Sequence, residues 1–338
     1  MPIGELDVFV RSVLPADSAL RVPKPARPIF EARPFPWWLL AAILAAIALG
    51  LGIWYWLRRR KRESKPTLLD PDLFSSKHFR LGISQQLLQQ IALGGTMIAL
   101  PIYLQMVLEY NALLAGLSIA PLSLSMFGVA LLAGRRAGGR RPSSIIRLGF
   151  LLLTVGILLL IPIVPRADSG WYLLVPLVIA GSGLGLLVSQ LNNYTLAPIS
   201  EERVSEAAGV NSAGGSFGLS FGLAFAGAIM LATLSVAFTD LTHASTVLAP
   251  AEKERVANAL EDDAQLLSNT QLQELLKGQP PATRDEIVRI NTEARPLALQ
   301  VALLVPILAG LVGLLNSFRM MRLPEVTPSG SVEGMALG

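Results

Sequence analysis

The strongest constraint on the fold of this chain is a set of long apolar segments separated by shorter charged ones. Of its 338 residues, 52% are apolar and 15% are charged, whereas soluble domains carry about 25% charged residues. Each segment can cross a hydrocarbon core of about 30 Å as a helix, and open strands would leave backbone groups without partners in lipid. The segments lie at 37–57, 81–108, 112–133, 148–165, 171–191, 207–238 and 297–318. We therefore predict an all-α polytopic membrane protein with about seven transmembrane helices.

Composition excludes several kinds of chemistry. The sequence contains no cysteine, which excludes disulfide scaffolds, thiolate metal sites and cysteine nucleophiles. His78 and His243 are too few for a histidine-rich metal site. We predict that the protein is not an enzyme and has no cofactor or metal. The net charge of +4 and the pI near 9.6 do not predict nucleic-acid binding, because the basic residues gather at the ends of apolar runs, as membrane topology requires.

The basic residues also predict the orientation of the chain in the bilayer. The cluster 58–62 follows the first apolar run directly and is expected in the cytoplasm. With that end inside, the cytoplasmic segments hold 16 Lys or Arg, and the short outer loops hold only Arg166. We expect an integral protein of the plasma (inner) membrane, with its N-terminus outside and its C-terminus cytoplasmic.

The predicted organisation along the chain follows from these assignments. A cap at 239–296 is expected to form two or three short helices outside, because Thr270 to Gln273 and Thr283 to Glu286 have the spacing of helix capping boxes. The predicted regions are a Pro-rich extracytoplasmic arm (1–36), a transmembrane helix (37–57), a basic cytoplasmic linker (58–80), a six-helix bundle that includes the cap (81–323) and a cytoplasmic tail (324–338).

A stripe of small residues marks the segment 207–238. Gly214, Gly218 and Gly222 recur every four residues, and Ala226 continues the series, so all four fall on one side of a helix. Each Gly costs about 1 kcal/mol relative to Ala in a helix interior. In a bilayer such a stripe permits close approach of two helix backbones. We predict that it is a helix-packing face.

Polar side chains in the apolar segments are the candidates for a substrate path. Gln85, Gln86, Gln89 and Gln90 fall within a sector of about 140° at 100° per residue. Such groups are costly in hydrocarbon unless they meet protein or a water-filled cavity. They could therefore bond between helices or form a hydrophilic wall. Further candidates for the substrate path are Tyr103, Gln105, Asn192, Asn193 and Asn211.

Several motifs resemble those of a known transporter family. The loop at 201–211, with its Glu-Arg pair and its Ala-Ala-Gly-Val-Asn stretch, precedes the glycine stripe. The segments 66–74 and 101–121 also match a linker and an outer turn of the same family. Together they resemble the 14-helix drug:proton antiporters of the major facilitator superfamily, over residues 66–323 and the preceding helix. The resemblance implies that 81–323 is the C-terminal six-helix bundle of that fold.

The chain departs from the family pattern in two places. Glu109-Tyr110-Asn111 stands where Gly-Tyr-Ser is usual, and Gly138 stands about where the inner loop between the third and fourth spans carries an Asp. The family places that acid in an inner latch. The family's proton-coupling carboxylates belong to its N-terminal six helices, and no span here has an acid or a base near its middle.

The resemblance implies a transporter of the drug or small-molecule efflux type. We expect an incomplete half that lacks the proton-coupling N-terminal bundle and does not perform coupled efflux alone. Its partners would be the lipid bilayer, a complementary N-terminal half or a second copy, and small amphipathic or cationic molecules. The alternative is a non-transporting membrane scaffold or partner subunit that interacts through its outer cap and its helix faces.

Overall fold

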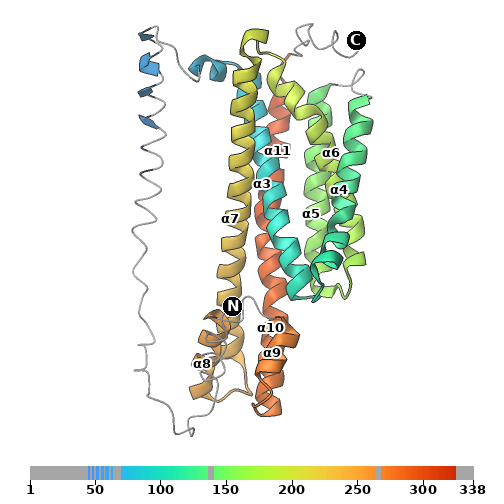
Figure 1. Cartoon of the computed structure of the whole chain (residues 1–338), viewed down its shortest axis with the longest axis vertical. Coiled ribbons are helices and arrows are strands. Elements are labelled where there is room, and N and C mark those ends of the chain that lie inside the picture. Colours follow the sequence, from blue (N-terminus) through green and yellow to red (C-terminus); the bar gives the residue numbers. More distant parts are fainter. Residues whose placement is uncertain are drawn as a thin grey trace. The chain divides into compact units, whose positions relative to one another are not determined.

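The computed structural model describes residues 70–135, 141–262 and 268–324, together with individual positions between 45 and 63. Within these residues there are helices and no strands, which confirms the all-α fold (Figure 1). The predicted helix at 37–57 lies almost entirely outside the described residues. The helices are α3 (Lys77–Met106), α4 (Ala112–Arg135), α5 (Pro142–Ile163), α6 (Leu174–Leu196), α7 (Val204–Ala244), α8 (Pro250–Asp262), α9 (Asn269–Leu275), α10 (Pro281–Ala302) and α11 (Leu304–Met321).

Six helical segments among the described residues are long and apolar enough to cross a membrane. Five of them contain α3, α4, α5, α6 and α7, and the sixth runs from Pro281 to Met321 through α10 and α11. The predicted span at 297–318 therefore begins inside α10 and continues in α11. The α3–α4 and α6–α7 turns are short, and Asn111 begins α4 by accepting a hydrogen bond from the Leu114 N–H, as an N-cap residue should.

Glycines bring α6 close to both α4 and α5, its neighbours in the bundle. A Cβ atom on Gly183 would lie 2.5 Å from the Gly149 carbonyl oxygen of α5, and one on Gly185 would lie 2.5 Å from the Met126 carbonyl oxygen of α4. Such contacts are possible only without a side chain. Phe150 and Ile157 of α5 are fully buried, and α5 also packs on α11.

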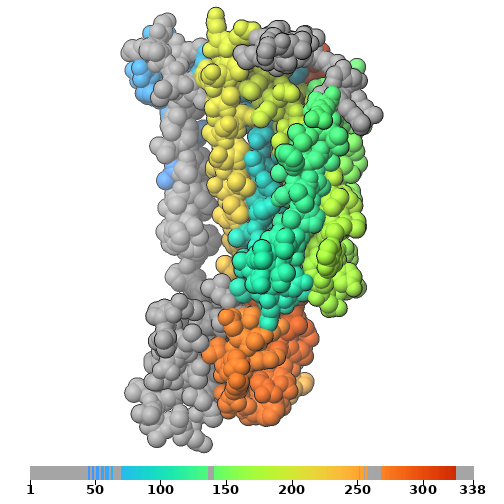
Figure 2. Space-filling model, turned by 45° about the vertical axis from the view of Figure 1, so that its right-hand side comes forward, coloured from blue at the N-terminus to red at the C-terminus, as the bar shows by residue number. Residues whose placement is uncertain are grey.

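The last two turns of α7 lead into a cap at one end of these helices (Figure 2). The cap has its own apolar core, in which Phe238 of α7 and Ile290 of α10 are completely buried together with Leu260 and Leu272. Helix α9 does start with a capping box, but it is formed by Ser268 and Gln271, and α10 begins at Pro281. The N-cap positions predicted at Thr270 and Thr283 were therefore wrong by two and three residues, since the N-cap residues are Ser268 and Pro280.

Candidate functional site

Helices α3 and α7 are in backbone contact along the glycine stripe. A Cβ atom on Gly218 would lie 2.6 Å from the Leu87 carbonyl oxygen, and one on Gly222 would collide with the Ile91 carbonyl oxygen. Gly94 of α3 is equally close to the Leu219 carbonyl oxygen of α7. Any side chain at these positions would separate the two helices.

Polar side chains border this contact. A Cβ atom on Gly215 would lie 3.1 Å from the Gln86 amide nitrogen, and one on Gly218 would lie 3.2 Å from the Gln90 Cβ, so both glutamines lie against α7. One turn before Gly215, Asn211 of α7 donates a hydrogen bond of 2.7 Å to the Asn192 side chain of α6. The structure thus brings together four predicted path residues from three helices.

The other two glutamines of α3 face a different neighbour. Gln85 is fully buried and donates a hydrogen bond of 3.0 Å to the Gly313 carbonyl oxygen of α11. Gln89 lies one turn further along α3 and is also buried. These amides could either form hydrogen bonds between helices or line a hydrophilic wall, and Gln85 forms a hydrogen bond between helices.

The remaining three predicted path residues lie apart from this polar group. Tyr103, near the other end of α3, donates hydrogen bonds to the carbonyl oxygens of Val164 (2.8 Å) and Ala167 (3.3 Å). Its hydroxyl therefore fixes α3 to the turn that follows α5. Gln105 and Asn193 are exposed, and the structure does not bring them together with the others.

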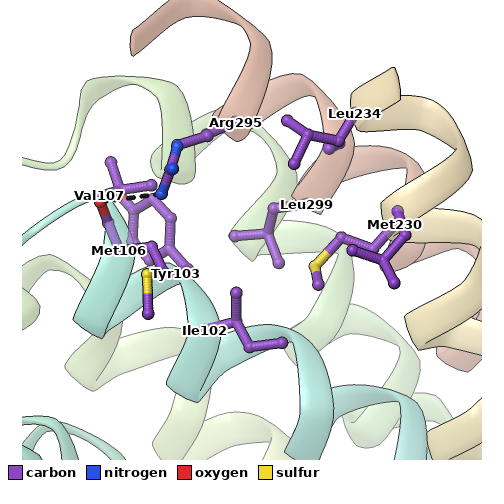
Figure 3. A pocket seen from close by; sticks show the side chains of 10 residues that line it. Ile102, Tyr103, Met106, Val107, Met230, Leu234, Arg295 and Leu299 are labelled. Carbon is purple, nitrogen blue, oxygen red and sulfur yellow. Dashed lines mark hydrogen bonds between the residues drawn. The ribbon is translucent and has the colours of Figure 1, made fainter. Parts of the chain in front are cut away.

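A cavity opens between α3, α7 and α10 where the glycine stripe ends (Figure 3). Its volume is about 80 Å³. The i+4 series that begins with Gly214 continues beyond Ala226 as Met230 and Leu234, and both of these larger residues line the cavity. The lining residues are Ile102, Tyr103, Met106, Val107, Met230, Leu231, Leu234, Arg295, Ala298 and Leu299.

Among the described residues that line the cavity, Arg295 is the charged one, and only 6% of it is exposed. Its Nε donates to the Asn291 side-chain oxygen (3.0 Å), and its Nη1 donates to the Met106 carbonyl oxygen (3.2 Å). Asn291 in turn donates to Asn269 at the start of α9. These bonds join the cavity wall to the cap.

Glu109 connects the cap to the α3–α4 turn. Its φ angle is +55°, in the left-handed region that favours glycine. Its carboxylate accepts hydrogen bonds from the backbone N–H and the hydroxyl of Thr270 at the first turn of α9. Burial raises the pKa of Glu109, but bonds from Thr270, Ser268 and Asn269 outweigh it and hold the pKa below its ordinary value of 4.5.

Comparison with known proteins identifies the family of this chain. The family model of the Major Facilitator Superfamily matches residues 34–223, which is more than half of the chain. The chain belongs to the Major Facilitator Superfamily. This membership confirms the resemblance seen in the motifs, and it makes the chain an integral membrane protein of a transporter family whose members are generally not enzymes.

Relatives within the superfamily are named as exporters and drug transporters. The probable actinorhodin transporter of Streptomyces coelicolor is 24% identical over 184 residues, covering 54% of this chain and 32% of that protein. Multidrug resistance protein Stp of Mycobacterium tuberculosis is 30% identical over 196 residues (57% and 35%). Drug efflux pump JefA of the same species is 29% identical over 231 residues (66% and 44%). The chain thus spans roughly a third to under half of the length of these superfamily relatives.

Sequence reasoning missed the cavity and Arg295 in this superfamily member. Arg295 was assigned to the cap because it precedes the apolar run at 297–318. The available signal was the change along the α7 series from Gly and Ala to Met230 and Leu234. That change predicts that two helices in contact at one end must separate at the other.

Proposed function

We propose that this chain provides one wall of a small-molecule efflux transporter and works with a second helical bundle. Transport in the superfamily proceeds by rocking of two bundles around a site near the middle of the membrane. The relatives named above support an efflux role for this member. Residues 81–323 would then be one of the two bundles, and small amphipathic or cationic molecules would be its substrates.

The observation that carries this proposal is a polar strip on the surface of α7 and its neighbours. Ser212, Ser216 and Ser220 are exposed on α7 within a span that is largely apolar. Gln86 and Gln90 lie beside the same helix, and the exposed Asn192 adds a further amide from α6. Polar groups on a span normally face protein or a water-filled cavity rather than lipid. The strip therefore fits a surface that meets a second bundle across a hydrophilic path.

The strip itself carries no charge and would recognise substrates through hydrogen bonds. Amide and hydroxyl groups can both donate and accept hydrogen bonds, so they suit varied amphipathic molecules. Proton coupling requires a membrane carboxylate that changes protonation, and no acid lies near the middle of the predicted spans. We infer that the second bundle supplies that carboxylate, from a complementary N-terminal half.

The proposed orientation places the cap outside and the α6–α7 turn in the cytoplasm. The cysteine-free sequence allows single cysteines to be introduced at Glu202, in that turn, and at Lys277, in the cap. In whole cells of the host, an impermeant thiol reagent should label the cysteine at 277 and leave the one at 202 unlabelled. The opposite pattern would reverse the orientation.

An efflux assay tests the function directly. The chain would be co-expressed with the N-terminal six helices of Stp in cells that lack their own drug pumps, and ethidium accumulation would be measured. Co-purification of the two polypeptides would establish that they assemble. We expect lower accumulation only when both are present, and no gradient-dependent dye uptake by vesicles that contain this chain alone.

Matched substitutions then test the strip. The double variant Q86L/Q90L should abolish the fall in ethidium while its level in the membrane stays unchanged. Q105L is the control, because it makes the same chemical change at an exposed amide outside the strip. Unchanged accumulation with the assembled pair would contradict the transporter proposal and favour the membrane scaffold.

A further inference from the structure

We propose that α5 and α11, at their ends away from the cap, bind the phosphate head group of an anionic phospholipid through Arg147 and Arg322. The two helices pack on each other, and both of these ends lie opposite the cap (Figure 1). This site goes beyond the proposed efflux function, because it needs neither a second bundle nor the polar strip on α7.

Arg147 and Arg322 both lie next to one exposed aromatic ring. The Arg147 guanidinium of α5 lies over the Phe318 ring of α11, 5.6 Å from its centroid, and 47% of Phe318 is exposed. Arg322 follows Phe318 by four residues at the C-cap of α11 and is exposed, so both lie on the same side of that helix. Two guanidiniums from different helices are thus placed on one side of the bundle.

Close packing of α5 on α11 holds Arg147 at this position. A Cβ atom on Gly313 of α11 would collide with the Phe150 ring of α5, and one on Gly310 would collide with the Thr154 hydroxyl. Phe150 is fully buried and lies three residues after Arg147, on nearly the same side of α5. The distance of Arg147 from α11 is therefore set by the packing before a ligand arrives.

The positive charge at this end of the two helices is not neutralised by acids. Among the described residues, no Asp or Glu forms a salt bridge with Arg147 or Arg322. The contact with Phe318 leaves the charge of Arg147 in place, because an aromatic ring has no net charge. The exposed Arg319 adds a third positive charge. A guanidinium presents a planar fork of N–H groups that matches a phosphate, and basic residues at a membrane surface attract anionic lipids.

An apolar track for the acyl chains leads away from these arginines. Leu151 of α5 follows Arg147 by one turn, and Leu315 of α11 precedes Phe318 by three residues, so each lies on the same side of its helix as that residue. Both leucines are exposed, by 43% and 67%, on segments long and apolar enough to cross a membrane. A charged end followed by exposed apolar side chains suits a phospholipid, whereas a free phosphate would leave the leucines without contact.

Lipid titration of the full chain in a neutral detergent tests this site. The protein would be purified in dodecyl maltoside, and its Tm would be measured against added phosphatidylglycerol. The Tm should rise in a saturable manner, because a ligand that binds only the folded state stabilises it. Phosphatidylcholine, whose head group has no net charge, should give a smaller shift, and inorganic phosphate should give none because it has no acyl chain.

Single substitutions locate the site. In R147Q and in R322Q the half-saturating concentration of phosphatidylglycerol should rise by about fivefold, as expected for the loss of one basic residue at an anionic surface. R166Q is the matched control, because it removes the same charge from an exposed arginine just beyond the other end of α5. Arg322 is exposed at the end of its helix, so R322Q keeps the test decisive if R147Q does not fold.

Four results would overturn the proposal. Equal shifts with phosphatidylglycerol and phosphatidylcholine would show that the head group is not recognised, and an equal shift with inorganic phosphate would show that no lipid is required. An equal loss of affinity in R166Q would assign the effect to net charge alone. Unchanged half-saturating concentrations in the folded Arg147 and Arg322 variants would place the lipid elsewhere.

Discussion

The same two helices, α3 and α7, meet in opposite ways at their two ends. In the half that contains Gly218 and Gly222, the backbones touch and leave no room for a side chain. In the half next to the cap, Met230 and Leu234 occupy the same stripe, and a cavity of about 80 Å³ opens. One series of residues spaced by four thus sets both a closed and an open helix contact. Side-chain size along a single stripe therefore sets how closely the two helices approach each other.

The largest expected effect comes from breaking the closed half. Gly218→Leu should destabilise the folded protein by about 3 kcal/mol or more, at the upper end for overpacking, because its Cβ would meet the Leu87 carbonyl oxygen at 2.6 Å. The measurement is the monodisperse fraction in size-exclusion chromatography after extraction in detergent. Ser220→Leu is the control, since it adds the same side chain on the exposed side of α7. Similar yields of the two variants would contradict the close contact.

A smaller loss of stability is expected from removing a hydrogen-bond donor in the open half. Tyr103→Phe removes the hydroxyl that donates to Val164 and Ala167 and leaves two buried carbonyl oxygens without that donor. The cost should be about 0.5–1.5 kcal/mol, as for a typical buried hydrogen bond. A fall in Tm measures it, and the exposed Tyr172→Phe should leave Tm unchanged. Equal behaviour of the two variants would show that the hydroxyl does not hold α3 in place.

The smallest effect is local and depends on pH. Because the Glu109 pKa is lowered in the folded protein, its attachment to α9 stabilises the cap above the ordinary pKa of 4.5 and is lost as pH falls through the lower, folded value. Hydrogen-exchange protection of α9 should therefore decrease on acidification, while protection of α5 and α6 stays constant.

Glu109→Gln isolates this contact at neutral pH. The neutral amide cannot form the charge-assisted bonds to Thr270, so α9 should already be less protected in the variant at pH 7, and its further loss below pH 4.5 should disappear. A pH dependence of α9 protection that is the same in both proteins would assign the effect to other groups.

The sequence predicted the elements of the fold better than their contacts. Long apolar runs allow few structures other than membrane helices, so the described spans agree with the predicted ones within a few residues, apart from the longer helices at the cap. The exact helix starts were less predictable, because Ser268 and Thr270 both suit a capping position and the contact with Glu109 lies far away in sequence.

The site was predictable only in part, for a similar reason. Four adjacent amides on α3 were visible in the sequence, but which of them faces α11 and which faces α7 depends on packing between distant segments. The cavity depends on three helices at once, and no periodicity within one helix shows where a third helix will pass. Arg295 shows the same limit, since its place in the wall depends on a hydrogen bond to the Met106 carbonyl oxygen at the end of α3, far away in the sequence.

The most direct test of the closed and open halves is cysteine cross-linking, which the cysteine-free sequence makes unambiguous. In the closed half, a Cβ at Gly214 would lie 3.5 Å from the Cγ2 atom of Ile83, so cysteines at these two positions would be in direct side-chain contact, as a disulfide requires. In the open half, Ile102 and Leu234 lie across the cavity from each other (Figure 3). Mild oxidation in membranes should form a disulfide in I83C/G214C, whereas I102C/L234C should need a longer bifunctional thiol reagent. Direct disulfide formation in I102C/L234C at the same rate would mean that the helices are closed along their whole length, and would contradict this account.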